Sequence, residues 1–163
     1  MRCVIDVLVE DNRRDIRRLT IEEDKLVENA AKMGEYAITR LREISKDCPF
    51  VSDVRGKGVM FGIDFARPKQ GLKLKLAWDA LHKLNFGVFG QMIIIPLLQK
   101  HKILTQVAGY HTEVIKFLPP MTITKEDMDW FLGAMEEVLD DTQRIPGAAW
   151  DTVFGLAKRV VRA

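Results

Sequence analysis

The stretch from Val59 to Phe65 constrains the fold most, because residue character alternates along it. Its odd-numbered positions are Val, Phe, Ile and Phe, and its even-numbered positions are Met, Gly and Asp. A period of two places the odd positions on one face of a β-strand, so that the strand is half-buried. The segment R-G-K-G at 55–58 precedes it, and its two glycines allow a tight backbone. The sequence therefore predicts a turn at 55–58 that feeds a strand.

A long helix is predicted on the N-terminal side of this strand. Thr20 and Glu23 have the spacing of a capping box, so we expect the helix to begin at Thr20. Apolar residues then recur every three or four positions, at Leu26, Ala30, Met33, Ala37, Leu41 and Ile44. Charged residues point outward between them, at Glu28, Lys32, Glu35 and Arg42. One apolar stripe indicates a helix that packs by one face only.

A second capped helix is predicted near the other end of the chain. Thr124 and Asp127 form a box-like pair that can satisfy backbone amides at a helix start. An apolar stripe follows, made of Met128, Leu132, Met135 and Leu139. We expect this helix to cover the sheet.

Weaker patterns lie between the two helices. Gly71–Asn85 has a helical length and spacing, and Pro96 in the apolar run Met92–Leu98 is expected to open a short helical turn. Two short strands are predicted at Ile103–Val107 and Val114–Phe117. This order of elements predicts the α+β class, with a small antiparallel or mixed sheet of three to four strands and helices on one side.

Composition excludes several classes of protein. Of the 163 residues, 25 are Lys or Arg and 23 are Asp or Glu, with both signs interspersed, which argues against nucleic acid as a partner. No apolar stretch approaches the roughly 20 residues that cross a membrane, and the start is too acidic for a signal peptide. With only Cys3 and Cys48, a disulfide framework is not expected, so a cytoplasmic location is predicted.

The chain shows no self-contained catalytic motif. His82, His101 and His111 lack the spacing of metal ligands. Cys48 has no histidine near it in sequence and is interpreted as a small packing residue. The sequence therefore predicts a small domain with no catalytic residue and no metal site.

Two other motifs have structural explanations. The segment 55–58 is too short for a phosphate-binding loop and is followed by a strand rather than a helix. Glu126 and Asp127 are adjacent acids, but the first turn of a helix favours negative charge, so a capping role suffices.

Two phrases carry a family resemblance. They are D-V-R-G-K-G-V-M-F-G-I-D-F at Asp53–Phe65 and V-I-K-F-L-P-P-M-T-I-T-K-E-D-M at Val114–Met128. Both resemble the ornithine-type, class III aminotransferases that depend on pyridoxal phosphate. That family has R-G-x-G-L-x-x-G on a strand, and downstream an apolar pair, a basic residue, P-P-L and a capped helix. The segments L-V-E-N-A-A-K-M-G-E-Y and I-L-T-Q-V-A-G also resemble it, so the likeness covers Leu26–Leu139.

The resemblance implies the C-terminal small domain of a fold-type-I enzyme. Residues 1–19 would be a helical connection from a large domain, 20–140 the small domain, and 141–163 an amphipathic helical extension that packs on the parent protein rather than on a membrane. The complete enzyme would be a homodimer that moves an amino group from a primary amine or amino acid to a 2-oxo acid. Its cofactor would be pyridoxal 5'-phosphate. No lysine here lies in the family's cofactor-binding context, so the chain alone is not expected to bind it.

Two residues are candidates for binding substrate. Lys116 stands where many family members place an arginine that forks onto the substrate carboxylate, and a lysine offers a point charge instead. Diamines, other amines and ω-amino acids therefore remain possible substrates. The alternative is that Lys116 is an exposed strand residue with no role in binding. Arg55 is the second candidate, with a structural role in the turn or the domain interface as its alternative.

Two hypotheses follow for the chain as a whole. It is part of an aminotransferase and is inactive without the large domain, or it is a stand-alone, non-catalytic module descended from such a domain. The module would act through the apolar surface that otherwise faces the large domain.

Overall fold

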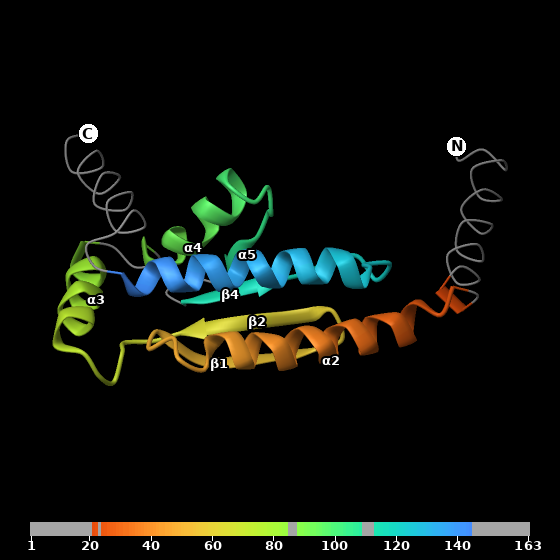
Figure 1. Cartoon of the computed structure of the whole chain (residues 1–163), viewed down its shortest axis with the longest axis horizontal. Helices are drawn as coiled ribbons and strands as arrows, with labels where there is room; N and C mark the ends of the chain where they lie inside the picture. Colours follow the sequence, from red (N-terminus) through yellow and green to blue (C-terminus); the bar gives the residue numbers. More distant parts are fainter. Residues whose placement is uncertain (1–20, 23, 85–87, 109–112, 145–163) are drawn as a thin grey trace, which may run out of the picture.

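The computed structural model describes residues 21–22, 24–84, 88–108 and 113–144. The predicted connection over residues 1–19 lies outside the described residues, and so does the predicted helical extension from residue 145 onward. In chain order the elements are α2 (Leu26–Ser45), β1 (Val51–Lys57), β2 (Met60–Phe65), α3 (Leu72–Leu84), α4 (Val88–Gln99), β3 (Gln106–Ala108), β4 (Val114–Phe117) and α5 (Lys125–Gln143). Figure 1 shows α2 and α5 beginning at the same end of the molecule and running side by side.

The four strands form one sheet with the order β1-β2-β4-β3, and every neighbouring pair is antiparallel. One row of paired residues crosses all four strands on the face toward the core: Val54, Ile63, Ile115 and Val107. The first three are at most 3% exposed. The predicted α+β class with a small antiparallel sheet is confirmed.

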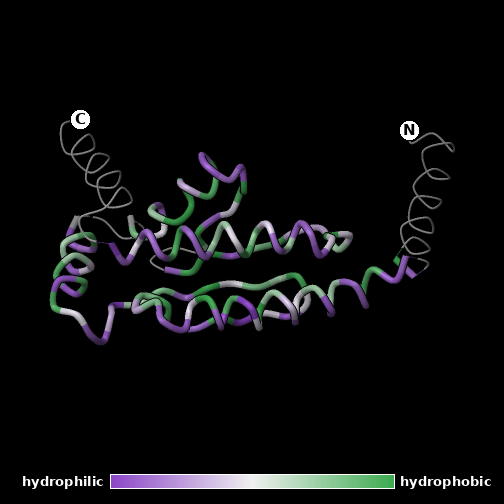
Figure 2. Tube along the Cα trace, in the orientation of Figure 1, coloured by the Kyte–Doolittle hydropathy of each residue, from purple (hydrophilic) through white to green (hydrophobic). Residues whose placement is uncertain are grey.

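Helices cover one face of this sheet. Phe131 of α5 contacts the rings of Phe61 and Phe117, with centroids 5.9 and 4.5 Å away. Phe89 of α4 lies 5.4 Å from Phe65 on the same side of β2. Both long helices alternate between hydrophobic and hydrophilic residues along their length (Figure 2), because each buries one side only. The prediction that the second capped helix, α5, covers the sheet is confirmed.

The start of the first long helix was predicted wrongly. It begins at Leu26 rather than at Thr20, because Lys25 has a left-handed backbone with φ 50° and ψ 41° that a right-handed helix cannot contain. Thr20 and Glu23 lie outside the described residues. The apolar stripe is confirmed, since Ala30, Met33, Ala37 and Leu41 are all buried.

The predicted turn at 55–58 is mostly a strand. Val51–Lys57 is β1, which pairs with β2, and the turn is confined to the residues between the two strands. Gly58 makes this turn with φ 56°. Sequence periodicity missed β1 because it is an edge strand in which Val54 alone is buried, so it has no apolar alternation.

Two elements between the long helices differ from their predicted bounds. Helix α4 runs from Val88 to Gln99 and contains Pro96, so the helix is longer than the predicted turn. The strand predicted at Ile103–Val107 is β3, Gln106–Ala108. Ile103 instead closes α4, because its N–H donates to Leu97 O over 2.9 Å after Lys102 adopts φ 59°. The predicted helix at Gly71–Asn85 and the strand at Val114–Phe117 are confirmed.

The predicted capping box of α5 is confirmed. Asp127 N–H donates to Thr124 Oγ1 over 3.2 Å, and Thr124 N–H donates to Asp127 Oδ2 over 3.2 Å. Replacing Thr124 with alanine is therefore expected to lower the free energy of unfolding by about 1 kcal/mol. Urea unfolding followed by circular dichroism measures the loss. Thr122→Ala, at an exposed position two residues earlier, is the matched control and is expected to change stability by less than about 0.5 kcal/mol. Equal losses in the two variants would contradict the capping role.

Candidate functional site

The face of the sheet away from the helices carries the candidate site. A second row of paired residues crosses all four strands there, and it consists of Arg55, Gly62, Lys116 and Gln106. This row alternates with the buried row one residue away on each strand, so its side chains project from the opposite face. We call this surface the open face. Both residues predicted to bind substrate, Lys116 and Arg55, lie on it.

Lys116 lies on β4 with Gly62 directly opposite on β2. Thr105 Oγ1 donates to the main-chain carbonyl of Lys116 over 2.9 Å and so holds this part of the strand. Within the described ranges, no hydrogen bond or ion pair involves the Lys116 ammonium group. Gly62 is itself buried, and a Cβ there would lie 3.2 Å from Ile115 O and 3.4 Å from a side-chain carbon of Val114. Lys116 is therefore a half-buried cation that pairs with no described side chain and is available to an anionic group.

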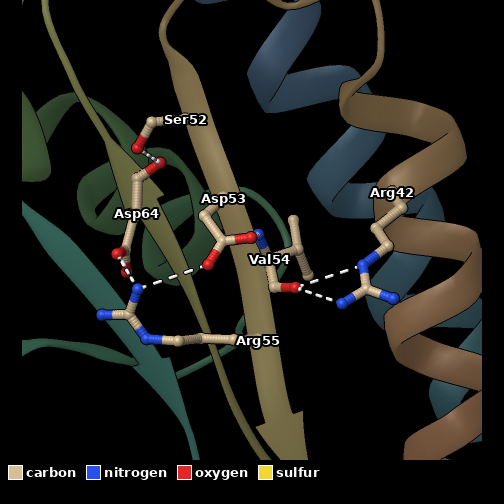
Figure 3. Close-up of polar contacts among 6 residues, drawn as sticks. All are labelled: Arg42, Ser52, Asp53, Val54, Arg55 and Asp64. Atoms are coloured by element: carbon tan, nitrogen blue, oxygen red, sulfur yellow. Dashed lines mark hydrogen bonds and ion pairs between the residues drawn. The ribbon is translucent and has the colours of Figure 1, made fainter.

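Arg55 is engaged with two carboxylates (Figure 3). Its Nη1 contacts Asp64 Oδ2 and lies 3.4 Å from Asp53 Oδ2. Asp64 lies on β2, so the guanidinium group ties β1 to β2. This contact supports the structural alternative for Arg55. The structure places Arg55 and Lys116 on one face, but two strands apart, which is about 10 Å between their backbones.

Further contacts fix β1 from both sides. Arg42 of α2 donates from Nε and Nη2 to Val54 O, over 3.2 and 2.9 Å, and Ser52 Oγ donates to Asp64 O over 3.0 Å (Figure 3). Arg42 was predicted only as an outward-facing helix residue. Its exposed guanidinium group therefore clamps the edge strand to the helix layer.

Sequence reasoning missed Gly62 and Asp64 as parts of this face. Both were read only as the outward positions of an alternating strand. Asp64 Oδ1 is buried and accepts no hydrogen bond from any described residue. The available signal was the pairing of an outward carboxylate with an arginine on the neighbouring strand, which needs the position of β1 and therefore the fold.

An apolar groove lies beside the end of β4, and neither Lys116 nor Arg55 lines it. Its volume is about 340 Å³, and it lies between the 103–104 segment, the loop after β4 and the start of α5. Its lining includes three exposed apolar side chains, Leu104, Leu118 and Trp130, which are 82%, 58% and 54% exposed. Asp127, the carboxylate in its wall, belongs to the capping box. The groove therefore offers contact area rather than catalytic groups.

Cys48 and the histidines add no chemistry. Cys48 is 4% exposed, and burial raises the pKa of its thiol, which suits the predicted packing role. His82 and His101 are described, and His111 lies outside the described residues. Across the described ranges, no three His, Cys, Asp or Glu side chains gather as metal ligands, and no described helix is long and apolar enough to cross a membrane.

Comparison with known proteins decides the family. Residues 18–139 match the family model of aminotransferase class-III, which is three quarters of the chain. The chain belongs to the class-III aminotransferase family. The resemblance seen in its sequence phrases is thereby confirmed. The share that matches contains both candidate residues, the whole described sheet, and α5 up to its last turns.

Curated relatives and solved structures agree with this assignment. The ornithine aminotransferase of Halalkalibacterium halodurans is 33% identical over 119 residues, covering 73% of this chain and 23% of that protein. The leucine/methionine racemase of Thermococcus litoralis is 30% identical over 123 residues, covering 76% and 25%. A solved transaminase with L-ala has a TM-score of 0.59 and 31% identity, covering 76% and 26%. This class-III chain thus spans about a quarter of the length of the relatives it matches.

Proposed function

We propose that the chain is the C-terminal small domain of a pyridoxal-phosphate-dependent aminotransferase and that it supplies one wall of the substrate pocket. The complete enzyme moves an amino group from a primary amine or amino acid to a 2-oxo acid, as a homodimer in the cytoplasm. Residues 1–19 connect to the large domain, 20–140 are the small domain, and 141–163 pack on the parent protein. The observation that carries the proposal is Lys116, unpaired within the described ranges, on the open face of a class-III domain.

The described residues do not fit the cofactor by themselves. Pyridoxal phosphate needs a lysine for its Schiff base and a group at its pyridine nitrogen. Lys116 lies half-buried beside Gly62 on a strand, and Asp64 is bound to Arg55 instead of being available to a ring nitrogen. The chain's own contribution is to bind and orient the substrate.

Lys116 performs this binding through its charge. An ammonium group donates to a carboxylate oxygen in a charge-assisted hydrogen bond, which is about twice as strong as a neutral one. The stem of Lys116 is flexible and its head is a point charge, so it fixes the position of a carboxylate without fixing its plane. This favours substrates with one carboxylate at a variable distance from the amine, such as ω-amino acids.

The purified 163-residue chain is expected to bind no pyridoxal phosphate and to catalyse no transamination. The reason is that the Schiff-base lysine belongs to the large domain. The measurement combines the cofactor's absorbance after dialysis with a mass spectrum after borohydride reduction, which makes a Schiff base permanent. A specific adduct on one lysine, together with transamination of an amino acid, would overturn this part of the proposal.

The second candidate function is a non-catalytic interaction module. The groove with Leu104, Leu118 and Trp130 favours it, because an exposed apolar patch of this kind marks a contact surface. Sedimentation separates the two functions. A monodisperse, stable chain supports the stand-alone interaction module. Self-association through an uncovered apolar face supports the aminotransferase small domain, whose apolar face the large domain would cover.

A further inference from the structure

His82 and Glu113 form a partly buried pair that the proposed function does not use. His82 Nε2 lies 3.1 Å from Glu113 Oε1, and the two side chains are 17% and 8% exposed. His82 also stacks on Trp78, with ring centroids 4.2 Å apart. His82 belongs to α3, and Glu113 directly precedes β4, so the contact joins two elements 31 residues apart.

The hydrogen bonds of His82 define where its protons are. Nδ1 lies 2.9 Å from the main-chain carbonyl of Trp78, and a carbonyl only accepts, so Nδ1 carries a proton. A neutral ring protonated at Nδ1 has no proton left at Nε2, and a bare carboxylate has none either. The contact between Nε2 and Glu113 therefore requires one shared proton. The geometry is met when both ring nitrogens donate, Nδ1 to the carbonyl of Trp78 and Nε2 to the carboxylate of Glu113.

The position of Glu113 gives the pair a role in the sheet. Phe65 N–H donates to Glu113 O over 2.8 Å, so Glu113 continues the pairing of β4 with β2 by one residue. Ile115 and Phe117 face the core, and strand alternation places the Glu113 side chain on that same face. A charged group thus stands at the end of an inward-facing apolar row, where it needs a partner.

This arrangement selects the register of a short strand. Strand β4 has four residues, and a slip of one residue would turn Lys116 into the core. A slip of two residues keeps the apolar alternation, so hydrophobic burial alone opposes it weakly. That slip would carry Glu113 into the place of Ile115, which is 0% exposed, and away from His82. The ion pair therefore penalises a slip that alternation tolerates.

We propose that His82 and Glu113 are positioning residues, which share one proton between α3 and β4 and thereby hold Lys116 opposite Gly62. The role given to Lys116 rests on the proposed function. The shared proton and the register are measured without an activity assay. A negative substrate assay therefore does not contradict this inference, and a negative register assay does not contradict the proposed function.

The protonation is tested by NMR of the full chain labelled with ¹⁵N, at neutral pH. His82 is expected to show two protonated ring nitrogens. Glu113→Gln is expected to keep the fold and convert His82 to the neutral ring protonated at Nδ1, because the amide can donate to Nε2. Glu137→Gln is the matched control, since the 44% exposed Glu137 lies 3.2 Å from the other described histidine, His101, and it is expected to leave His82 unchanged. A neutral His82 in the unsubstituted chain overturns the shared proton.

The register is tested with the double variant H82L/E113L. Replacing both members of a buried ion pair with apolar residues keeps a protein folded in many cases, so this variant avoids the unpaired charge that a single replacement leaves. The cross-strand contact between the α-protons of Gly62 and Lys116 is the readout. We expect this contact to weaken and a second set of β4 signals to appear. A single set of signals with the original contact at full strength overturns the positioning role.

Discussion

Replacing Gly34 with alanine is expected to destabilise the chain by about 3 kcal/mol, the upper part of the range for overpacking a core. Gly34 lies inside α2, where the turn between β1 and β2 crosses the helix. A Cβ at this position would lie 2.0 Å from Gly58 O and 2.2 Å from Gly58 C. Gly58 cannot easily move away, because it holds φ 56° in the tight turn between β1 and β2. The helix and the hairpin would have to separate.

Gly133→Ala is the matched control for this prediction. Gly133 is also inside a long helix, α5, but it is exposed and nothing lies within 4 Å of a Cβ built there. Alanine is the better helix former, so this variant is expected to gain about 0.5–1 kcal/mol. Urea unfolding of both variants gives the comparison. Two changes of the same sign would mean that the helix interior, rather than the close approach to Gly58, determines the result.

Replacing Lys116 with methionine is expected to lower kcat/KM about 10- to 100-fold for amino donors that carry a carboxylate. This follows from the loss of a hydrogen bond to a charged group, about 1.5–3 kcal/mol, where each 1.4 kcal/mol is tenfold. Methionine has a similar length and no charge, so packing on β4 is preserved. The assay uses the chain completed by a large domain, with residues 18–139 replacing the matching segment of the Halalkalibacterium halodurans ornithine aminotransferase.

Three controls accompany the Lys116 variant. Lys116→Arg is expected to retain the activity, because a guanidinium group binds carboxylates with two parallel hydrogen bonds. Lys73→Met removes an exposed lysine of α3, away from the open face, and is expected to change nothing. A primary amine without a carboxylate is expected to react equally with the original enzyme and Lys116→Met. An equal loss for this amine would show that Lys116 acts on folding or on the cofactor site instead.

The spacing of apolar residues and the capping residues correctly predicted the elements that bury one continuous face. The strand at 60–65, the long apolar stripe of α2 and the Thr124 capping box of α5 all appear where local sequence placed them. In each, the residues that decide the structure are neighbours in sequence. The errors occur where tertiary contacts decide. Edge strand β1 has little burial of its own, and Lys25 interrupts the helical path although the sequence around it favours a helix.

The candidate site shows the same division. Lys116 and Arg55 were found from sequence phrases, and the structure places both on the open face. That face also contains Gly62 and Asp64, which only the strand pairing reveals as neighbours of these cations. The engagement of Arg55 by Asp64 required the position of β1, and the contact between His82 and Glu113 required the fold to bring α3 beside the residue that precedes β4.

Transamination by the completed enzyme tests the central claim most directly. The chimera that carries residues 18–139 of this chain, loaded with pyridoxal phosphate, is expected to move amino groups from a carboxylate-bearing donor to a 2-oxo acid, while the 163-residue chain alone is expected to do nothing. A chimera that folds and binds the cofactor but transfers no amino group from any donor would contradict the account, and transamination by the isolated chain would contradict it equally.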